Sequence, residues 1–133
     1  MRITRELADE IVAHAREEAP NECCGLVGGT NGAATRVYRA ANAEASPFRY
    51  VVDPQDQLRI MGEIDDAGEE LVGIYHSHTR SEAYPSQTDV NLAEGWPDPL
   101  YLICSIAQAE PELRAFAIRD ERIEEVELVV EEA

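Results

Sequence analysis

The chain has 133 residues, of which 44% are hydrophobic and 29% charged, and its formal net charge is −16. This length suits one domain with a single core, and we expect residues 1–133 to form it. The 27 acidic residues against 11 basic ones repel phosphate backbones and anionic lipids, which argues against nucleic acids and membranes as partners. All 11 basic residues are arginine, which excludes Schiff-base and P-loop lysine chemistry.

Two features of the sequence bear on the compartment. The opening stretch, MRITRELADEIV, is charged and helical in pattern, unlike a secretory signal, and the chain contains no run of about 18 apolar residues. The three cysteines are an odd number, so we expect small buried side chains and not a disulfide framework. We therefore expect a cytoplasmic protein.

The first half of the chain predicts a helix followed by short strands. Thr4 can cap a helix that ends before Pro20, because apolar residues recur at i, i+3, i+4 and i+7 between them. Apolar runs separated by Gly-Gly and Asn-Gly turns come next. The predicted elements are a helix over 4–18 and strands over 23–28, 34–41 and 48–52.

A second helix begins at Asp53-Pro54, an acidic N-cap with proline at the first helical position. We expect it to bury Leu58, Met61 and Ile64. The apolar run after this helix has no polar face and is therefore expected at the centre of the sheet. The predicted elements are a helix to about 68, a strand over 71–76, a helix over 86–94, and strands over 101–106, 113–118 and 122–130.

The order of helix, strands, helix, strand, helix and strands predicts an α/β protein. It indicates a mixed sheet with helices packed on it, because a regular doubly wound fold would alternate strand and helix throughout.

Two histidines end the central strand, in the sequence His76-Ser77-His78. Residues i and i+2 of a strand point to the same face, so both imidazoles project together. Asp89, in the first turn of the next predicted helix, is a plausible third ligand. Two histidines and one carboxylate, with a fourth position left for water, are typical of a catalytic zinc site.

Each part of this pattern has an ordinary explanation when taken alone. A pair of histidines two residues apart is more often surface or core histidine than a metal site. Ser86 and Asp89 also fit a helix capping box. For Asp89 the two interpretations compete, because a side chain tied to the cap is not expected to bind metal as well.

The joint spacing HxH-x7-SxxD, formed by His76, His78, Ser86 and Asp89, resembles that of the JAMM (MPN-type) metallopeptidases. Glu22, in the stretch NECCGL, matches the upstream glutamate of that family. The resemblance implies an α/β/α sandwich with helices on both sides of the sheet, related to the cytidine deaminases. It also implies one zinc ion held by the two histidines and Asp89, Glu22 as general base, and Ser86 as a hydrogen-bond donor to the oxyanion.

Three segments, HSHTRSEAYPSQTDV, ECCG and NAEASPFRY, are similar to the actinobacterial Mec type of this family. Mec-type enzymes release cysteine from the C-terminus of a ubiquitin-like sulfur-carrier protein, so the implied partner is a carrier with a Gly-Gly(-Cys) C-terminus. Many family members have proline after the second histidine, where this chain has Thr79. The carrier's terminal carboxylate needs a cation, for which Arg80 is the first candidate and Arg49 the second. Tyr84 is a further candidate substrate contact.

The sequence leaves four alternatives. The first is a JAMM peptidase that removes another residue or extension from a different carrier. The second is a non-catalytic MPN scaffold, although no expected position is missing. The third is a nucleobase deaminase, which requires HxE and PCxxC motifs that the chain lacks. The fourth is a cysteine nucleophile at Cys23 or Cys24, for which no orienting group is evident.

Overall fold

The computed structural model describes residues 1–132 as three helices and eight strands. No helix in this part of the chain is long and apolar enough to cross a membrane. In chain order the elements are β1 (Arg2–Thr4), α1 (Arg5–Glu18), β2 (Cys24–Thr30), β3 (Ala33–Ala40), α2 (Pro54–Asp66), β4 (Glu70–His78), α3 (Gln87–Ala93), β5 (Leu100–Ser105), β6 (Glu112–Arg119), β7 (Arg122–Val126) and β8 (Val129–Glu131).

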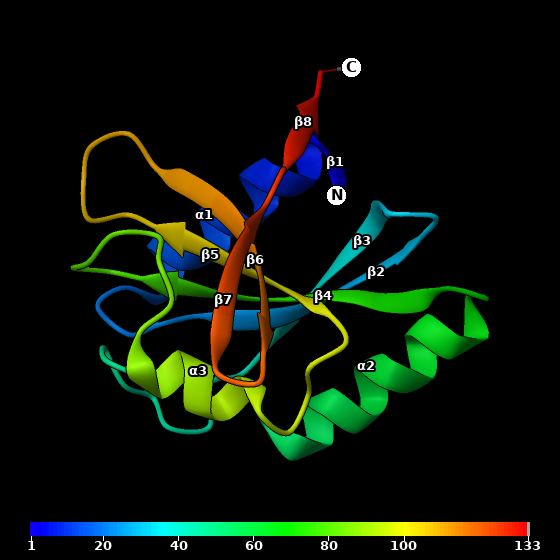
Figure 1. Cartoon of the computed structure of the whole chain (residues 1–133), viewed down its shortest axis with the longest axis horizontal. Helices are drawn as coiled ribbons and strands as arrows, with labels where there is room; N and C mark the ends of the chain where they lie inside the picture. The colour runs from blue at the N-terminus through cyan, green and yellow to red at the C-terminus, as the bar shows by residue number, and fades with distance from the viewer. Residues whose placement is uncertain (133) are drawn as a thin grey trace.

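The strands of residues 1–132 form one mixed sheet in the order β7-β6-β5-β4-β2-β3-β1-β8. Strand β4 lies in the interior of the sheet, antiparallel to β2 and parallel to β5. Helices α2 and α3 pack on one face of the sheet, and α1 packs on the other (Figure 1). The predicted α/β class, a mixed sheet with helices on both sides, is confirmed.

Strand β4 is apolar at most positions because its two faces pack in two different hydrophobic clusters. Ile74 packs with residues of α2 and α3, whereas Tyr75 packs on the opposite face with Ile11 and Ala15 of α1. Successive side chains of a strand point to opposite faces, so a strand covered on both faces needs apolar residues at every position. The predicted central place of this strand is confirmed.

Side-chain caps start all three helices where the sequence predicts them. The Thr4 hydroxyl accepts a hydrogen bond from the Leu7 amide at 3.2 Å, and Asp53 caps α2 ahead of Pro54. Ser86 caps α3. Such caps satisfy amides that have no partner within the helix.

The prediction that α2 buries Leu58, Met61 and Ile64 is wrong for Leu58. Ile60 and Ile64 are buried, Met61 is half-buried, and Leu58 is 78% exposed. Two residues correspond to about 200° of helical rotation, so Leu58 points away from the face that carries Ile60. The buried stripe is formed by the i, i+4 pair instead.

The strand predicted over 48–52 does not form. This segment is irregular, with a single bridge between Asn42 and Val52. Tyr50 and Val52 are buried, but Phe48 is 71% exposed. Tyr50 and Val52 anchor a loop against the core, so apolar residues at alternate positions do not indicate a strand here.

The C-terminal strand predicted over 122–130 is two strands. Strand β7 ends at Val126 on one edge of the sheet, and β8 begins at Val129 on the opposite edge, beside β1. The sheet therefore curves until its two edges are joined by residues 127–128 (Figure 1). Strand β1, which the sequence did not indicate, has only three residues and too few apolar positions to show a period.

Candidate metal centre

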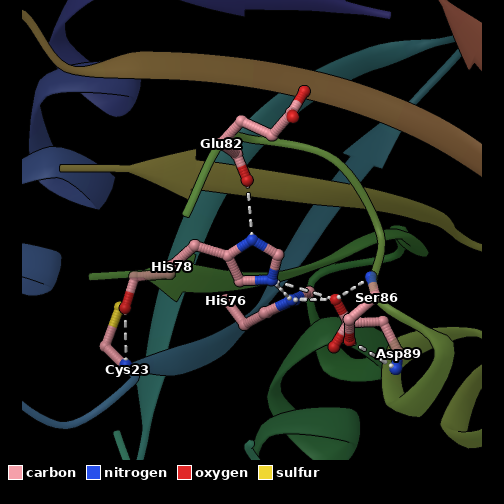
Figure 2. A network of polar contacts seen from close by, with 7 residues as sticks. Cys23, His76, His78, Glu82, Ser86 and Asp89 are labelled. Atoms are coloured by element: carbon pink, nitrogen blue, oxygen red, sulfur yellow. Dashed lines mark hydrogen bonds and ion pairs between the residues drawn. The ribbon is translucent and has the colours of Figure 1, made fainter. Parts of the chain in front are cut away.

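Three buried side chains meet where β4 ends and α3 begins. His76 and His78 lie on the same face of β4, as their spacing predicts, with their Nε2 atoms 3.2 Å apart. The Oδ2 atom of Asp89 lies 3.1 Å from the Nε2 atom of His76 and 3.0 Å from that of His78. Figure 2 shows these groups pointing toward one another. Together they could hold a metal ion.

The helix cap and this cluster share Asp89. The Ser86 hydroxyl accepts a hydrogen bond from the Asp89 amide at 3.1 Å, and the Ser86 amide donates to Asp89 Oδ2 at 3.0 Å. Asp89 thus belongs to the capping box and faces both histidines at the same time, although the sequence led us to expect these two roles to compete. A carboxylate oxygen has lone pairs for more than one partner, and the cap fixes the orientation of the carboxylate toward the histidines.

The tautomer of His78 explains why this cluster suits a cation. Its Nδ1 atom lies 2.8 Å from the Glu82 carbonyl oxygen, which only accepts, so Nδ1 carries the hydrogen (Figure 2). In the neutral ring the Nε2 lone pair then faces the Asp89 carboxylate at 3.0 Å. Two acceptors at that distance repel each other unless a proton or a metal ion lies between them. The carbonyl contact is also the outer-shell arrangement typical of metal-binding histidines.

The pKa values of His78 and Asp89 are shifted by their burial and by the contacts just described. Burial opposes the charged form of His78, but its hydrogen bonds to Asp89 and to the Glu82 carbonyl outweigh burial and raise its pKa. Burial alone would raise the pKa of Asp89, but the two histidines and the Ser86 amide hold it well below its usual range. The carboxylate is therefore charged and ready to bind a cation.

His76 is enclosed more completely than His78. Its side chain is fully buried, and the ring of Tyr50 stacks on it with centroids 4.2 Å apart and planes 18° from parallel. Burial lowers the pKa of His76, which favours the neutral imidazole that metal ions require. Its Nδ1 atom has no hydrogen-bond partner among residues 1–132.

Glu22 lies just before β2, whose first residue, Cys24, is paired in the sheet with His76. The Glu22 side chain is 5% exposed, and its Oε1 atom has no partner among the described residues. Burial raises the pKa of Glu22 to about 8, with a smaller opposing effect of His78 and a further rise from Asp89. A buried, unpaired carboxyl of this kind is suited to exchanging protons near neutral pH.

Ser86 faces solvent at the edge of the cluster. Its oxygen accepts the cap hydrogen bond from the Asp89 amide, so its own hydroxyl hydrogen remains available for donation. The structure thus brings His76, His78, Asp89 and Ser86 together around the start of α3, with Glu22 exerting an electrostatic influence on the same cluster.

The three candidate substrate contacts lie on two loops beside the cluster. The Arg80 guanidinium lies 5.9 Å from the ring centroid of the exposed Phe48, which joins the loop after β4 to the loop before α2. Arg49 is paired with Glu44 at 3.5 Å. Tyr84 is 43% exposed and packs edge-on against Phe116. Of the two arginines, Arg80 has no ion pair within residues 1–132.

The three cysteines are free and buried. Burial raises the pKa of Cys23 and Cys24 to about 12 and that of Cys104 to about 11. All three are therefore protonated thiols at neutral pH, which removes the basis for a cysteine nucleophile.

Several residues around the cluster were not indicated by the sequence. The backbone carbonyl of Glu82 binds His78, and Tyr50 packs on His76. The hydroxyl of Thr79 donates to the Pro20 carbonyl at 3.3 Å, tying the loop after the second histidine to the turn before Glu22. A backbone carbonyl carries no sequence signal, and the buried Tyr50 resembles any other core aromatic.

Comparison with known proteins places this site in a family. A model of the prokaryotic homologues of the JAB domain matches residues 4–119. The chain is 42% identical over 126 residues to a CysO-cysteine peptidase of Mycobacterium tuberculosis, covering 92% of this chain and 86% of that protein. It is 39% identical to a desampylase of Haloferax volcanii, covering 77% and 78% of the two chains.

The fold agrees with a solved relative. The solution structure of a protein from Desulfitobacterium hafniense matches with a TM-score of 0.91 and 35% identity, covering 99% of this chain and 93% of that one. The resemblance found in the sequence is thereby confirmed, and the deaminase and scaffold alternatives are not supported. The chain belongs to the JAB family, also called JAMM or MPN, and is a metallopeptidase whose two-histidine, one-carboxylate cluster suits zinc.

Proposed function

We propose that residues 1–133 act as one zinc peptidase domain in the cytoplasm, which removes cysteine from the C-terminus of a ubiquitin-like sulfur-carrier protein. The bond cleaved is the amide after the carrier's Gly-Gly. The observation that carries this proposal is the 42% identity to a CysO-cysteine peptidase over 92% of the chain. Neither nucleic acid nor membrane is a partner in this proposal, in keeping with the net charge of −16.

In this proposal His76, His78 and Asp89 hold the metal. When bound there, zinc supplies Lewis-acid chemistry, since it makes a water molecule more acidic and polarises the scissile carbonyl. The contacts of His78 to the Glu82 carbonyl and of Asp89 to the Ser86 amide, at 2.8 and 3.0 Å, keep both ligands in orientation when the metal exchanges.

Glu22 is the proposed proton carrier. It accepts a proton from the attacking water as the C–O bond forms, and it delivers that proton to the amine nitrogen as the C–N bond breaks. The buried carboxyl, with its pKa raised to about 8, retains a proton near neutral pH long enough to give it up to the leaving group. Ser86 is the proposed donor to the oxyanion, because its hydroxyl is exposed at the helix start and its hydrogen is free.

Substrate placement is proposed for the two loops that flank the cluster. The carrier tail reaches the site in an extended form. Arg80, without an ion pair in the described residues, is the first candidate to bind the terminal carboxylate. Arg49 is the second, because binding would require it to exchange Glu44 for the substrate. Tyr84, 43% exposed, offers an aromatic surface beside the tail.

A second candidate function is removal of a different extension from another ubiquitin-like carrier. The 39% identity to a desampylase favours it, since the same cluster would serve any amide presented in the same way. The two candidates differ only in the residue or peptide that is joined to the carrier's terminal glycine.

Intact-mass analysis of the zinc-loaded enzyme with three carriers tests the proposal. The carriers end in Gly-Gly, in Gly-Gly-Cys, and in Gly-Gly linked to a longer peptide. We expect loss of one cysteine from the second, whereas the first should be unchanged. Cleavage of the longer extension alone would support the second candidate instead. If no carrier were cleaved, both would be wrong.

A further inference from the structure

The amide and the carbonyl of Glu22 itself are hydrogen-bonded to a loop and not to the sheet. Glu22 precedes β2, so it lies outside the strand ladder. Its amide donates to the Ser46 carbonyl at 2.8 Å, and its carbonyl accepts from Asn42 Nδ2 at 3.0 Å. Both partners belong to the segment between β3 and α2, which therefore determines where the Glu22 side chain begins.

Asn42 is the fixed point of that segment. Its Nδ2 atom donates to the carbonyls of Glu22 and Arg49, each at 3.0 Å. Its Oδ1 atom accepts from the amides of Glu44 and Val51, each also at 3.0 Å. Two carbonyls on one side and two amides on the other leave only one orientation of the side-chain amide. All four hydrogen bonds of the group are thus used within the loop and on Glu22.

The same loop also contacts the metal cluster, through Tyr50. Asn42 bridges to Val52, and the Ala43 amide donates to the Val51 carbonyl at 2.8 Å, which closes the loop at its base. Next to that base, Tyr50 stacks on His76 with ring centroids 4.2 Å apart. One side chain therefore connects the backbone of Glu22 to the ring that packs on His76.

We propose that Asn42 is a positioning residue for the hydrolysis, which holds Glu22 at a fixed place relative to the histidine that Tyr50 supports. The inference rests on the proposed function for its kinetic part only. Without the Asn42 donor, the Glu22 carbonyl loses its side-chain partner. Glu22 is then held on one side by its bond to Ser46 and on the other only through the Cys23 amide, which donates to Ser77 Oγ at 2.8 Å. A displacement of about 1 Å at a reacting group can cost about 100-fold in rate.

Two substitutions separate the donor from the acceptor half of the amide. Asn42→Asp keeps an acceptor for Glu44 and Val51 but loses both donors, and Asn42→Ala loses all four hydrogen bonds. We expect kcat for the carrier adduct to fall about 10- to 100-fold in both, with KM within about threefold of wild type. Agreement between the charged and the uncharged variant would exclude an effect of added charge. Ser46→Ala is the matched control, because it removes one hydrogen bond to Phe48 in the same loop and leaves the backbone carbonyl of Ser46 in place.

Two readouts do not depend on turnover. Zinc affinity should stay within about threefold of wild type in both variants, since no proposed ligand is touched. In the metal-free protein the Glu22 amide should exchange its hydrogen about 10-fold faster in both variants. The Val51 amide should stay protected in Asn42→Asp and lose protection in Asn42→Ala.

The inference would be overturned by a kcat within about twofold of the Ser46→Ala control in both variants, or by unchanged exchange at Glu22. A loss of zinc affinity that parallels the loss of kcat would also overturn it, because the loop would then act on the metal cluster. If wild-type enzyme cleaved none of the carriers, the proposed function would fail, and the exchange at Glu22 alone would decide for or against Asn42.

Discussion

The two faces of β4 carry polar residues that are equally buried but differ in their partners. Toward α1, the Tyr75 hydroxyl lies 2.7 Å from His14 Nδ1, and the Ser77 hydroxyl accepts from the Cys23 amide at 2.8 Å. On the side of α2 and α3, His76 and His78 face a carboxylate, and three buried atoms, His76 Nδ1, Glu22 Oε1 and Tyr38 Oη, have no partner within residues 1–132.

The difference shows that burial alone does not reveal a site. Tyr75, Ser77, His76 and His78 all have at most 4% of their surface exposed. On the α1 face the Tyr75 and Ser77 hydroxyls each have a partner, so these contacts stabilise the core. On the α3 face the acceptors converge and buried groups remain unpaired, which is costly in the absence of a function.

The largest expected effect is on turnover. Glu22→Gln should keep zinc binding within a few-fold, because Glu22 is not a proposed ligand, yet lower kcat by about 10²–10⁴ since the proton carrier is lost. Intact-mass kinetics on the Gly-Gly-Cys carrier, with zinc content measured in parallel, checks this.

The matched substitution on the α1 face of β4 is Tyr75→Phe. It removes the hydroxyl group that is hydrogen-bonded to His14 and should lower the free energy of unfolding by about 1–3 kcal/mol. It should leave kcat within about threefold of wild type. Equal losses of kcat in Glu22→Gln and Tyr75→Phe would show that the two faces do not differ in the way proposed.

The second prediction concerns two helix caps on opposite faces. Ser86→Ala and Thr4→Ala each remove a serine or threonine hydroxyl that accepts from a helix amide and should each cost about 1 kcal/mol in the free energy of unfolding. Only Ser86→Ala should also lower kcat, by about 10²–10³, because its hydroxyl is proposed to bind the oxyanion. A fall of only a few-fold would mean that Ser86 is chiefly a cap.

The third prediction uses the opposite pH dependence of the two faces. Burial, assisted by Arg39, lowers the pKa of His14 to about 4, from 6.5. Between these values the unfolded chain binds more protons at this position, so the contribution of His14 to the free energy of unfolding falls as pH falls, by a few kcal/mol in all. The difference in free energy of unfolding between metal-free wild type and His14→Gln, measured by urea unfolding, should therefore shift in favour of the variant as pH falls from about 6.5 to about 4.

Glu22 acts in the other direction. Its pKa is raised from 4.5 to about 8, so in this range the folded protein binds more protons at this position and the contribution of Glu22 to the free energy of unfolding falls as pH rises. The difference in free energy of unfolding between metal-free wild type and Glu22→Gln should therefore shift in favour of the variant as pH rises from about 4.5 to about 8. If the two differences shifted in the same direction with pH, the assignment of the two pKa shifts to the two faces would be wrong.

The sequence predicted those parts of the site that depend on local periodicity. The period of 2 placed His76 and His78 on one face, and the SxxD spacing placed Asp89 within the first turn of α3. Glu22 is distant in sequence, and its local pattern fits an ordinary turn, so only the resemblance to the JAMM family indicated it. The structure brings it toward the cluster through the pairing of β2 with β4.

The parts that were mispredicted or missed depend on tertiary contacts. The segment 48–52 alternates like a strand, but Asn42 supplies the hydrogen bonds that a ladder would have provided. Leu58 is apolar and helical, yet the sheet contacts the face of Ile60 and Ile64. An asparagine in a polar turn is typical of loops in general, so nothing distinguished Asn42 before its four partners were known.

The curvature of the sheet has a consequence for how the chain folds. Strand β1 pairs in parallel with β8, Arg2 opposite Val129, and the Met1 carbonyl accepts from the Val129 amide. The first strand of the described residues thus pairs with the last, across more than a hundred intervening residues. Contacts of such long range form late and slowly, whereas β2, β3 and β4, which position Glu22 and His76, are closer in sequence. The face that carries the candidate metal cluster can therefore assemble before β8 pairs with β1.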